Sequence, residues 1–246
     1  MDLSIVIPAF NEQTKIRHDI LDAADFIRDQ GLSGEILVAD DGSSDATSEQ
    51  ARGTVVPGPA SLHVITCSQH KGKGHAVKAG VAASSGQIVL CVDCGRCVPY
   101  TAALPALGWI RDKTCHVAIG SRRHAASRIV QGQPWHRRVS SKSLHRVLVL
   151  TFPELRDLPD TQCGFKVYSG PTCRELFAES IIDGFLFDVE ILVRAIRKGY
   201  TVRQFPIEWT CDPDSRLSTG KALMPVLKDI ARIRRAVSAK RTAHGA

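Results

Sequence analysis

Three short motifs constrain the fold of this chain most, because in two of them an apolar run stops at acidic and turn-forming residues. The motifs are VIPAFNE at 6–12, VADDGSSDAT at 38–47 and DTQCGFK at 160–166. An apolar run followed at once by Pro, Gly, Ser or Asp is typical of a buried strand that ends in a turn. In open α/β sheets, ligands bind at the carboxyl ends of the strands. The N-terminal part of the chain therefore predicts a nucleotide-type site at such an edge.

Strand-like and helix-like segments alternate through the first half of the chain. Strands are expected at 3–8, 35–40, 62–66, 87–93 and 116–120, with helices at 13–29, 43–52, 75–84 and 101–111 between them. The run at 87–93 is apolar throughout, which is typical of a strand buried on both faces and indicates a central position. This alternation predicts an α/β fold with a doubly wound, mostly parallel central sheet and helices on both faces.

The second half of the chain is more basic and less regular. Residues 122–138 are expected to form a basic, loop-like segment close to an anionic ligand. Further helices are expected at 139–152, 171–178 and 186–198, a late strand at 201–209, and a basic amphipathic helix at 221–237. No linker-like stretch divides the sequence, so a single domain is predicted over 1–246.

Charge and hydropathy narrow the range of partners. The chain has 246 residues and a formal net charge of +7, and such a basic surface suits a diphosphate, a lipid phosphate or a membrane surface. Nucleic acid is not an expected partner, since no nucleic-acid-binding motif is present and aromatic residues are few. No signal peptide and no apolar run long enough to span a bilayer are recognised. A cytoplasmic protein is expected, with peripheral binding to the inner face of the membrane as an open option.

Eight cysteines are present, and three of them lie close together in the sequence. Cys91, Cys94 and Cys97 form a C-x-x-C-x-x-C run that resembles part of an iron–sulfur motif. Thr101 stands where the next thiol of such a motif would be. Incidental cysteines of a reduced, cytosolic protein are therefore the favoured interpretation.

Polar residues at the predicted strand ends are candidate ligand contacts. Pro8 and Ala9 stand where a flat ring could lie, and Asp40 or Asp41 could accept a hydrogen bond from a nucleobase or a ribose hydroxyl. An Asx turn with a helix cap would use the same two acids, so both interpretations stay open. Lys73 lies in a glycine-bearing loop just before a predicted helix, where a lysine and the helix N-terminus attract phosphate. A solvated charged loop is the alternative there.

Later residues add candidate metal and phosphate ligands. Asp93 ends the fourth predicted strand, where a carboxylate could help to hold a divalent cation that bridges a diphosphate. Arg122 and Arg138 could bind phosphate oxygens through their guanidinium forks, with plain surface charge as the alternative. Asp188 lies at the start of an apolar helix, where it either caps the helix or faces a cleft.

Taken together, the motifs resemble glycosyltransferase family 2, and within it the dolichyl-phosphate or polyprenyl-phosphate glucose and mannose synthases. The segments that carry the resemblance are LSIVIPAFNE, ILVADDGSSDAT, HKGKGHAVKAG, VAIGSR, DTQCGFKVYSG, FLFDVEILVRAIRKGY and FPIEWTCDPDSRLS. The resemblance implies a GT-A fold and an inverting transfer of a hexose from a UDP- or GDP-sugar. It also implies Mg²⁺ or Mn²⁺ as a cofactor.

The resemblance assigns roles by position. It implies that the nucleotide is held by Pro8, Ala9, Glu12, Asp40, Asp41 and Lys73, the acceptor phosphate by Arg122, Arg138 and Gln162, and that Asp93, Asp160 and Asp188 are catalytic candidates. Asp93 would be the first acid of the family's metal-binding D-x-D motif. Gly95 occupies the position of the second acid, so the expected metal site lacks one carboxylate.

The resemblance also divides the chain by role. It implies a nucleotide-sugar-binding half at 1–120, an acceptor-side half at 121–215, and a basic helix and tail at 216–246. The expected acceptor is a polyprenyl phosphate, which is anionic near neutral pH and can attack without a strong base. The alternatives are a small soluble hydroxyl acceptor, with Asp160 or Asp188 as base, and a nucleotide-sugar-binding protein with weakened catalysis.

Overall fold

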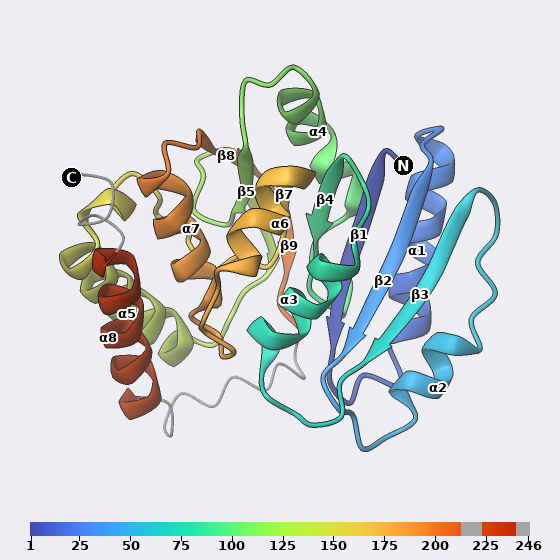
Figure 1. Ribbon diagram of the computed structural model, residues 1–246, viewed down its shortest axis with the longest axis horizontal. Helices are drawn as coiled ribbons and strands as arrows, with labels where there is room; N and C mark the ends of the chain where they lie inside the picture. The colour runs from blue at the N-terminus through green and yellow to red at the C-terminus, as the bar shows by residue number, and fades with distance from the viewer. Residues whose placement is uncertain (213–222, 240–246) are drawn as a thin grey trace.

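The computed structural model of the chain describes residues 1–212 and 223–239, including their side chains except those of 135–138, 223 and 239. The strands of its main sheet are β1 (Leu3–Ala9), β2 (Gly34–Asp40), β3 (Ala60–Thr66), β4 (Ile88–Cys91), β5 (Val117–Ser121), β7 (Lys166–Ser169) and β8 (Val202–Pro206). They follow the order β3-β2-β1-β4-β7-β5-β8, which places β4 in the middle as predicted (Figure 1). Every pairing is parallel except the two that β7 makes, so the mostly parallel α/β sheet is confirmed.

Helices surround this sheet. They are α1 (Ile16–Asp29), α2 (Thr47–Arg52), α3 (Lys73–Ala83), α4 (Leu104–Arg111), α5 (Trp135–Thr151), α6 (Gly170–Ala178), α7 (Phe187–Arg197) and α8 (Leu223–Ala239). Successive side chains of a strand point to opposite faces, so Ile5 and Ile7 pack with α1 and α4, whereas Val6 packs with α3, α6 and α7. The sheet is therefore buried on both faces, and ligands can reach it at its strand ends.

The register of the parallel strands brings their carboxyl ends to one edge. Ala9 pairs with Asp40, and the backbone N–H of Asp41 donates to the carbonyl of Ala9 at 2.9 Å. On the other side of β1, the N–H of Val92 donates to the carbonyl of Val6 at 3.0 Å. The polar residues that follow β1, β2 and β4 consequently meet at the same edge.

The sequence does not predict β7, which lies antiparallel between β4 and β5. Lys166, its first residue, pairs with Cys91, the last residue of β4. Because β7 runs against β4, its beginning lies at the edge where β4 ends. The DTQCGFK motif at 160–166 is thereby delivered to the same edge as the ends of the parallel strands.

Two further segments differ from the expectation. The basic segment at 122–138 is not all loop, since it contains β6 (Arg128–Gln131) and the first turn of α5. The predicted late strand at 201–209 is interrupted after Pro206, and β9 (Glu208–Thr210) pairs with β6 in a separate two-stranded sheet. After Pro206 the chain no longer pairs within the main sheet, because β9 pairs in parallel with β6 instead.

The C-terminal helix α8 packs on the domain. Its residues Ile230, Ile233 and Val237 are buried in the core that also contains α7. In Figure 1, α5, α7 and α8 stand together at one side of the sheet. None of the helices described is both long and apolar enough to cross a bilayer.

Candidate active site

Asp40 and Asp41 form the turn after β2. The carboxylate of Asp40 is buried and accepts hydrogen bonds from the backbone N–H and the hydroxyl of Ser43, at 3.0 and 2.5 Å. Gly42 has a φ of +73°, and a Cβ there would lie 2.9 Å from the backbone of His70. Asp40 therefore binds the backbone and side chain of its own turn, and it does not cap α2, which begins at Thr47.

Asp41 fastens the glycine-bearing loop to this turn. Its buried carboxylate accepts the N–H groups of Lys71 and Gly72 at 3.2 and 2.6 Å and lies 2.7 Å from Nδ1 of His70. Asp41, Cys67 and His75 also place potential metal-ligating atoms within 4.8 Å of one another. Since the Asp41 oxygens already bind the loop backbone, we regard this carboxylate as the anchor of the loop.

A flat ring surface that the sequence motifs did not predict lies beside these acids. The rings of Phe10 and His70 are stacked with centroids 3.8 Å apart and an interplanar angle of 21°. Pro8 is half-buried and Ala9 is buried directly before this pair. Glu12, next in the motif, is bound through its N–H to Thr47 at 2.7 Å. The only sequence signal for the stack was an aromatic residue in the first motif and a histidine before the lysines.

The start of α3 carries Lys73 to the middle of the edge. Cβ atoms at Gly72 and Gly74 would lie 2.6 and 2.5 Å from the carbonyl oxygens of Asp183 and Ile182, so only glycine permits this approach. The ammonium of Lys73 forms an ion pair with Asp93 and remains 23% exposed. The close backbone contact thus holds a cationic helix N-terminus beside the end of β4.

Charges around this pair shift both pKa values. Burial opposes the charged form of Lys73, but the carboxylates of Asp93 and Asp188 raise the pKa of Lys73 above its ordinary value. Burial likewise opposes ionisation of Asp93, but Lys73, Lys166 and Arg122 hold its pKa below the ordinary value. Both groups are therefore charged near neutral pH.

The backbone of the DTQCGFK motif lies directly on Asp93. A Cβ at Gly164 would come within 2.1 Å of a carboxylate oxygen of Asp93, so no larger residue fits there without displacing the acid. Asp93, Gly164, Cys97 and Trp209 line a hollow that is open to solvent. Its volume, with the adjoining solvent space, is about 330 Å³. The side chain of Asp93 is 38% exposed, so a ligand in this hollow can reach it.

Asp160 begins the same motif and is bound to Arg122. The backbone N–H, Nε and Nη2 of Arg122 donate to its carboxylate at 2.9, 2.8 and 2.7 Å. The guanidinium also lies 5.3 Å from the ring centroid of Trp209. Burial opposes ionisation of Asp160, but the hydrogen bonds from Arg122 hold its pKa below the ordinary value. Asp160 is therefore an ionised, fully engaged carboxylate.

Gln162 and Arg138 complete the predicted acceptor side. Gln162 lines a second hollow with Arg123, His145 and Asp160, on the α5 side of the motif. Arg138 lies in α5, but its side chain is outside the part that the structure describes. Its predicted contact with the acceptor stays a prediction.

Asp188 pairs with Lys166, a residue that was not among the predicted site residues. Nζ of Lys166 donates to Asp188 at 2.5 Å, and both side chains are buried. Burial raises the pKa of Asp188, in spite of the opposing charges of Lys166 and Lys73. A lysine at the start of a short strand has no local signature of this role, because its partner lies on another element.

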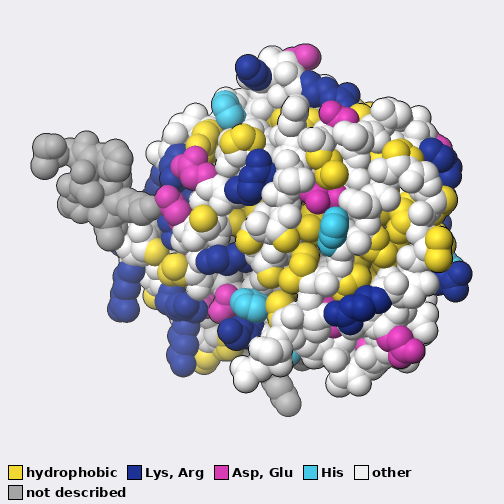
Figure 2. All heavy atoms as spheres, turned by 45° about the vertical axis from the view of Figure 1, so that its right-hand side comes forward, with side chains coloured by type: hydrophobic (Ala, Val, Ile, Leu, Met, Phe, Trp, Pro, Cys, Tyr) yellow, Lys and Arg dark blue, Asp and Glu magenta, His cyan; other side chains and the backbone are white. Residues whose placement is uncertain are grey.

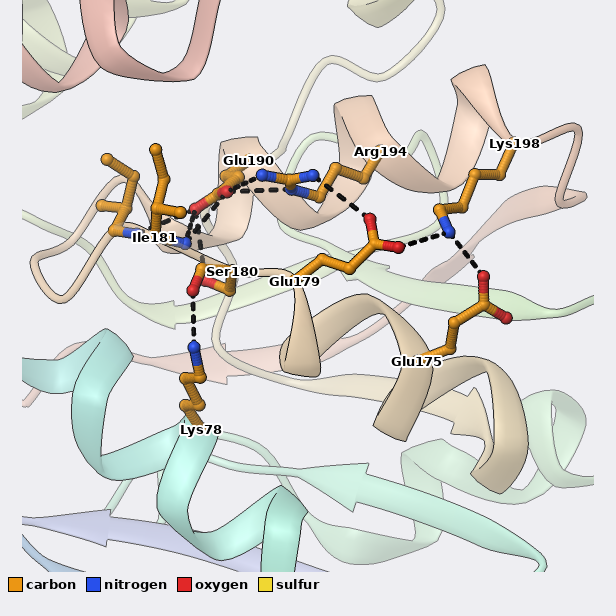
Figure 3. A network of polar contacts seen from close by, with 9 residues as sticks. Lys78, Glu175, Glu179, Ser180, Ile181, Glu190, Arg194 and Lys198 are labelled. Atoms are coloured by element: carbon orange, nitrogen blue, oxygen red, sulfur yellow. Dashed lines mark hydrogen bonds and ion pairs between the residues drawn. The ribbon is translucent and has the colours of Figure 1, made fainter. Parts of the chain in front are cut away.

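A polar network next to α3 supports the glycine-bearing loop that leads into Lys73. The buried carboxylate of Glu190 accepts the N–H groups of Ile181 and Ile182 at 3.0 and 2.9 Å and the guanidinium of Arg194 at 2.8 and 2.7 Å (Figure 3). Lys78 of α3 donates to the carbonyl of Ser180 at 2.6 Å. The network fixes the segment against which the glycines at 72 and 74 pack, so Glu190 is structural.

The turn after β4 is held by α1. The buried carboxylate of Asp19 accepts the N–H groups of Gly95 and Arg96, both at 3.0 Å, and the thiol of Cys94 at 3.1 Å. Burial raises the pKa of Cys94 far above its ordinary value. Among the described residues, the three thiols at 91, 94 and 97 do not form a common group of metal ligands.

A divalent cation at this edge would need oxygen ligands near Asp93. Gly95 supplies none, but a Cβ placed on it would lie 3.0 Å from Oδ2 of Asp212. Burial and the carboxylates of Asp93 and Asp212 raise the pKa of Cys97 to about 12. Carboxylates from two parts of the chain therefore border this turn, and oxygen donors of this kind suit Mg²⁺ or Mn²⁺.

Solved structures share this architecture. Mannosyl-3-phosphoglycerate synthase from Rubrobacter xylanophilus aligns with a TM-score of 0.65 at 20% identity, over 100% of this chain and 75% of that one. Glucosyl-3-phosphoglycerate synthase from Mycobacterium tuberculosis, in complex with Mn²⁺, uridine diphosphate and phosphoglyceric acid, aligns with a TM-score of 0.62 at 20% identity, over 95% and 75%. The fold described above is that of a GT-A glycosyltransferase.

The family follows from the sequence comparisons. A sequence model of glycosyl transferase family 2 matches residues 4–171. Dolichyl-phosphate beta-glucosyltransferases from Dictyostelium discoideum and Saccharomyces cerevisiae are 31% and 30% identical to this chain, over 94% and 95% of its length and 73% and 74% of theirs. The chain belongs to glycosyl transferase family 2 and is a glycosyltransferase, as its motifs predicted.

Proposed function

We propose that this enzyme transfers glucose, with inversion, from a nucleoside diphosphate glucose to a polyprenyl phosphate such as dolichyl phosphate. The relatives that match nearly the whole chain are named dolichyl-phosphate beta-glucosyltransferases. The single structural observation that carries the proposal is the pairing of carboxylates at the site. Asp93, Asp160 and Asp188 are each bound to a cationic side chain.

This pairing favours an acceptor that needs no general base. A hydroxyl acceptor must lose a proton, and a base has to reach it with an available carboxylate oxygen. Asp160 is held by three donors of Arg122, and Asp188 is buried against Lys166. A lipid phosphate is ionised near neutral pH, so its oxygen can attack the anomeric carbon without help from either acid.

The donor would lie along the strand ends. We place its base beside the stacked rings of Phe10 and His70 and its diphosphate at the N-terminus of α3, where Lys73 supplies positive charge. UDP-glucose is the donor we favour, since a structural neighbour of this fold binds uridine diphosphate. Stabilisation by UDP-, GDP- and ADP-glucose in a thermal-shift series would identify the nucleotide, because a ligand of the folded state raises its stability.

Positive charge around the leaving group would assist the transfer. Lys73 would stabilise the charge that develops on the leaving diphosphate, because its ammonium lies at the strand edge. Asp93 would hold Mg²⁺ or Mn²⁺, and the ion when bound would neutralise part of the diphosphate charge. Asp160 would keep the guanidinium of Arg122 in one orientation for the acceptor phosphate.

A membrane surface is the expected place of the lipid acceptor. Val147 and Leu150 of α5 and Met224 and Leu227 of α8 are exposed, and the two helices pack against each other. Figure 2 shows Lys and Arg side chains lying closest together at the lower left of the face it presents. We infer that the exposed apolar side chains enter the interface of an anionic bilayer. Leu150→Asp should then weaken sedimentation with anionic vesicles, whereas unchanged sedimentation would contradict this placement.

Transfer assays test the proposal directly. The enzyme should convert UDP-glucose and a polyprenyl phosphate to a lipid-linked glucose whose anomeric configuration is opposite to that of the donor. Efficient turnover with a soluble hydroxyl acceptor, and none with the lipid phosphate, would overturn it. Arg138→Ala should weaken use of the acceptor more than binding of the donor, measured as separate KM values.

A further inference from the structure

A side chain at position 95, where the chain has glycine, would point toward the carboxylate of Asp212. A Cβ built on Gly95 would lie 3.0 Å from Oδ2 and 3.4 Å from Cγ of Asp212. Asp212 follows β9, and the N–H of Thr210 donates to the carbonyl of Cys97 at 2.9 Å. This hydrogen bond ties the end of β9 to the turn after β4. A carboxylate is thus present where the side chain of an acid at 95 would extend.

The backbone explains why the acid is not at position 95 itself. Gly95 has a φ of +102°, a conformation that L-residues rarely adopt and that glycine adopts without cost. The turn is fixed in this form because Asp19 accepts the N–H groups of Gly95 and Arg96. An aspartate at 95 would be strained and would also press on Asp212. The turn therefore supplies no carboxylate of its own beyond that of Asp93.

We propose that Asp212 is the second acid of the cation site and holds Mg²⁺ or Mn²⁺ together with Asp93 and the donor diphosphate. The inference rests on the proposed nucleotide-sugar site. Asp212 is suited to the role because its side chain is only 12% exposed and is already arranged around a positive charge. Hard cations of this size take carboxylate oxygens and complete their coordination with phosphates and water.

The carboxylate of Asp212 forms an ion pair with the ammonium of Lys15. Its Nζ lies 3.0 and 2.9 Å from the two carboxylate oxygens of Asp212 and 3.4 Å from Glu12. An ammonium at this place balances the charge of Asp212 and competes with a divalent cation for the same oxygens. Removal of Lys15 should therefore strengthen cation binding, whereas removal of Asp212 should weaken it. Opposite effects of two neighbouring substitutions distinguish a ligand from a merely structural partner.

The test is Mn²⁺ binding by the full chain in the presence of UDP, followed by the electron paramagnetic resonance signal of free Mn²⁺. Asp212→Asn and Asp93→Asn should each weaken Mn²⁺ binding by about tenfold or more, in the range found when a metal site loses a supporting group. Asp212→Glu keeps a carboxylate and should retain most of the affinity. Lys15→Met should raise the affinity. Asp22→Asn is the matched control, because Asp22 lies on α1 and pairs with Arg96 beside the same turn.

The outcomes separate the two proposals. If Asp93→Asn abolishes Mn²⁺ binding and Asp212→Asn changes it no more than Asp22→Asn does, Asp212 is only the partner of Lys15 and the inference is wrong. If the wild-type chain binds UDP but no Mn²⁺, the inference is also wrong while the donor site stands. If the wild-type chain binds no nucleoside diphosphate at all, the proposed function fails first. Thermal unfolding of each variant without ligands shows whether Asp212→Asn remains folded.

Discussion

Replacement of Glu190 by glutamine tests whether the network next to α3 supports the fold. Glutamine has the shape of glutamate, but its NH₂ group is a donor and would face donors from Ile181, Ile182 or Arg194. Arg194 is 5% exposed and would keep only Glu179, at 3.3 Å, as an anionic partner. Removing one partner of a buried ion pair costs about 3–5 kcal/mol. We expect the free energy of unfolding to fall by that amount.

The assay is equilibrium unfolding in urea, followed by circular dichroism. Glu175→Gln is the matched control, since Glu175 also binds a cationic partner, Lys198, but is 46% exposed and should cost less than about 1 kcal/mol. Glu190→Gln combined with Arg194→Met removes both charges, so the double variant should lose less than the sum of the two single losses. A loss below about 1 kcal/mol for Glu190→Gln alone would refute the reasoning.

Three further substitutions follow from the same structure. Gly164→Ala would push a Cβ onto the carboxylate of Asp93, so we expect weaker UDP and Mn²⁺ binding by calorimetry with a smaller change in Tm. Gly95→Asp should lower Tm and should not raise metal-dependent activity, because the turn requires a φ of +102°. Burial opposes ionisation of Glu35, but hydrogen bonds from Ser4 and Ser85 hold its pKa below the ordinary value. Its stabilisation is therefore complete above the ordinary pKa and is lost as pH falls through the folded value, so Glu35→Gln should flatten the acid limb of stability measured by urea unfolding.

The convergence of three predicted site residues on one edge could be inferred from the sequence. Asp40, Lys73 and Asp93 each follow or precede an element of a parallel sheet, and parallel strands bring their carboxyl ends to one edge. The structure confirms the sheet and joins the three through the Asp41 anchor and the Lys73–Asp93 ion pair. The local pattern could not decide whether Asp40 binds a ligand or caps its turn, because both uses place the same acid after the same strand.

What the sequence could not predict depends on contacts between distant elements. The strand β7 has four residues and begins with a lysine, so it carries no apolar pattern from which its reversed direction could be inferred. The partner of that lysine, Asp188, stands on α7 and meets it only after β7 has been inserted between β4 and β5. The position of Asp212 against Gly95 depends in the same way on the small second sheet.

The charges at the strand edge connect these features. Three acids, Asp93, Asp160 and Asp188, are matched by three cations at Lys73, Arg122 and Lys166, so this cluster is balanced before any ligand enters. A donor diphosphate adds negative charge to a balanced site, and in a partly buried setting that charge is poorly screened. It has to be offset either by drawing Lys73 away from Asp93 or by bringing in a cation. A divalent ion held by Asp93 would bring in the required positive charge. It would also let Lys73 move to the phosphates without leaving Asp93 unpaired.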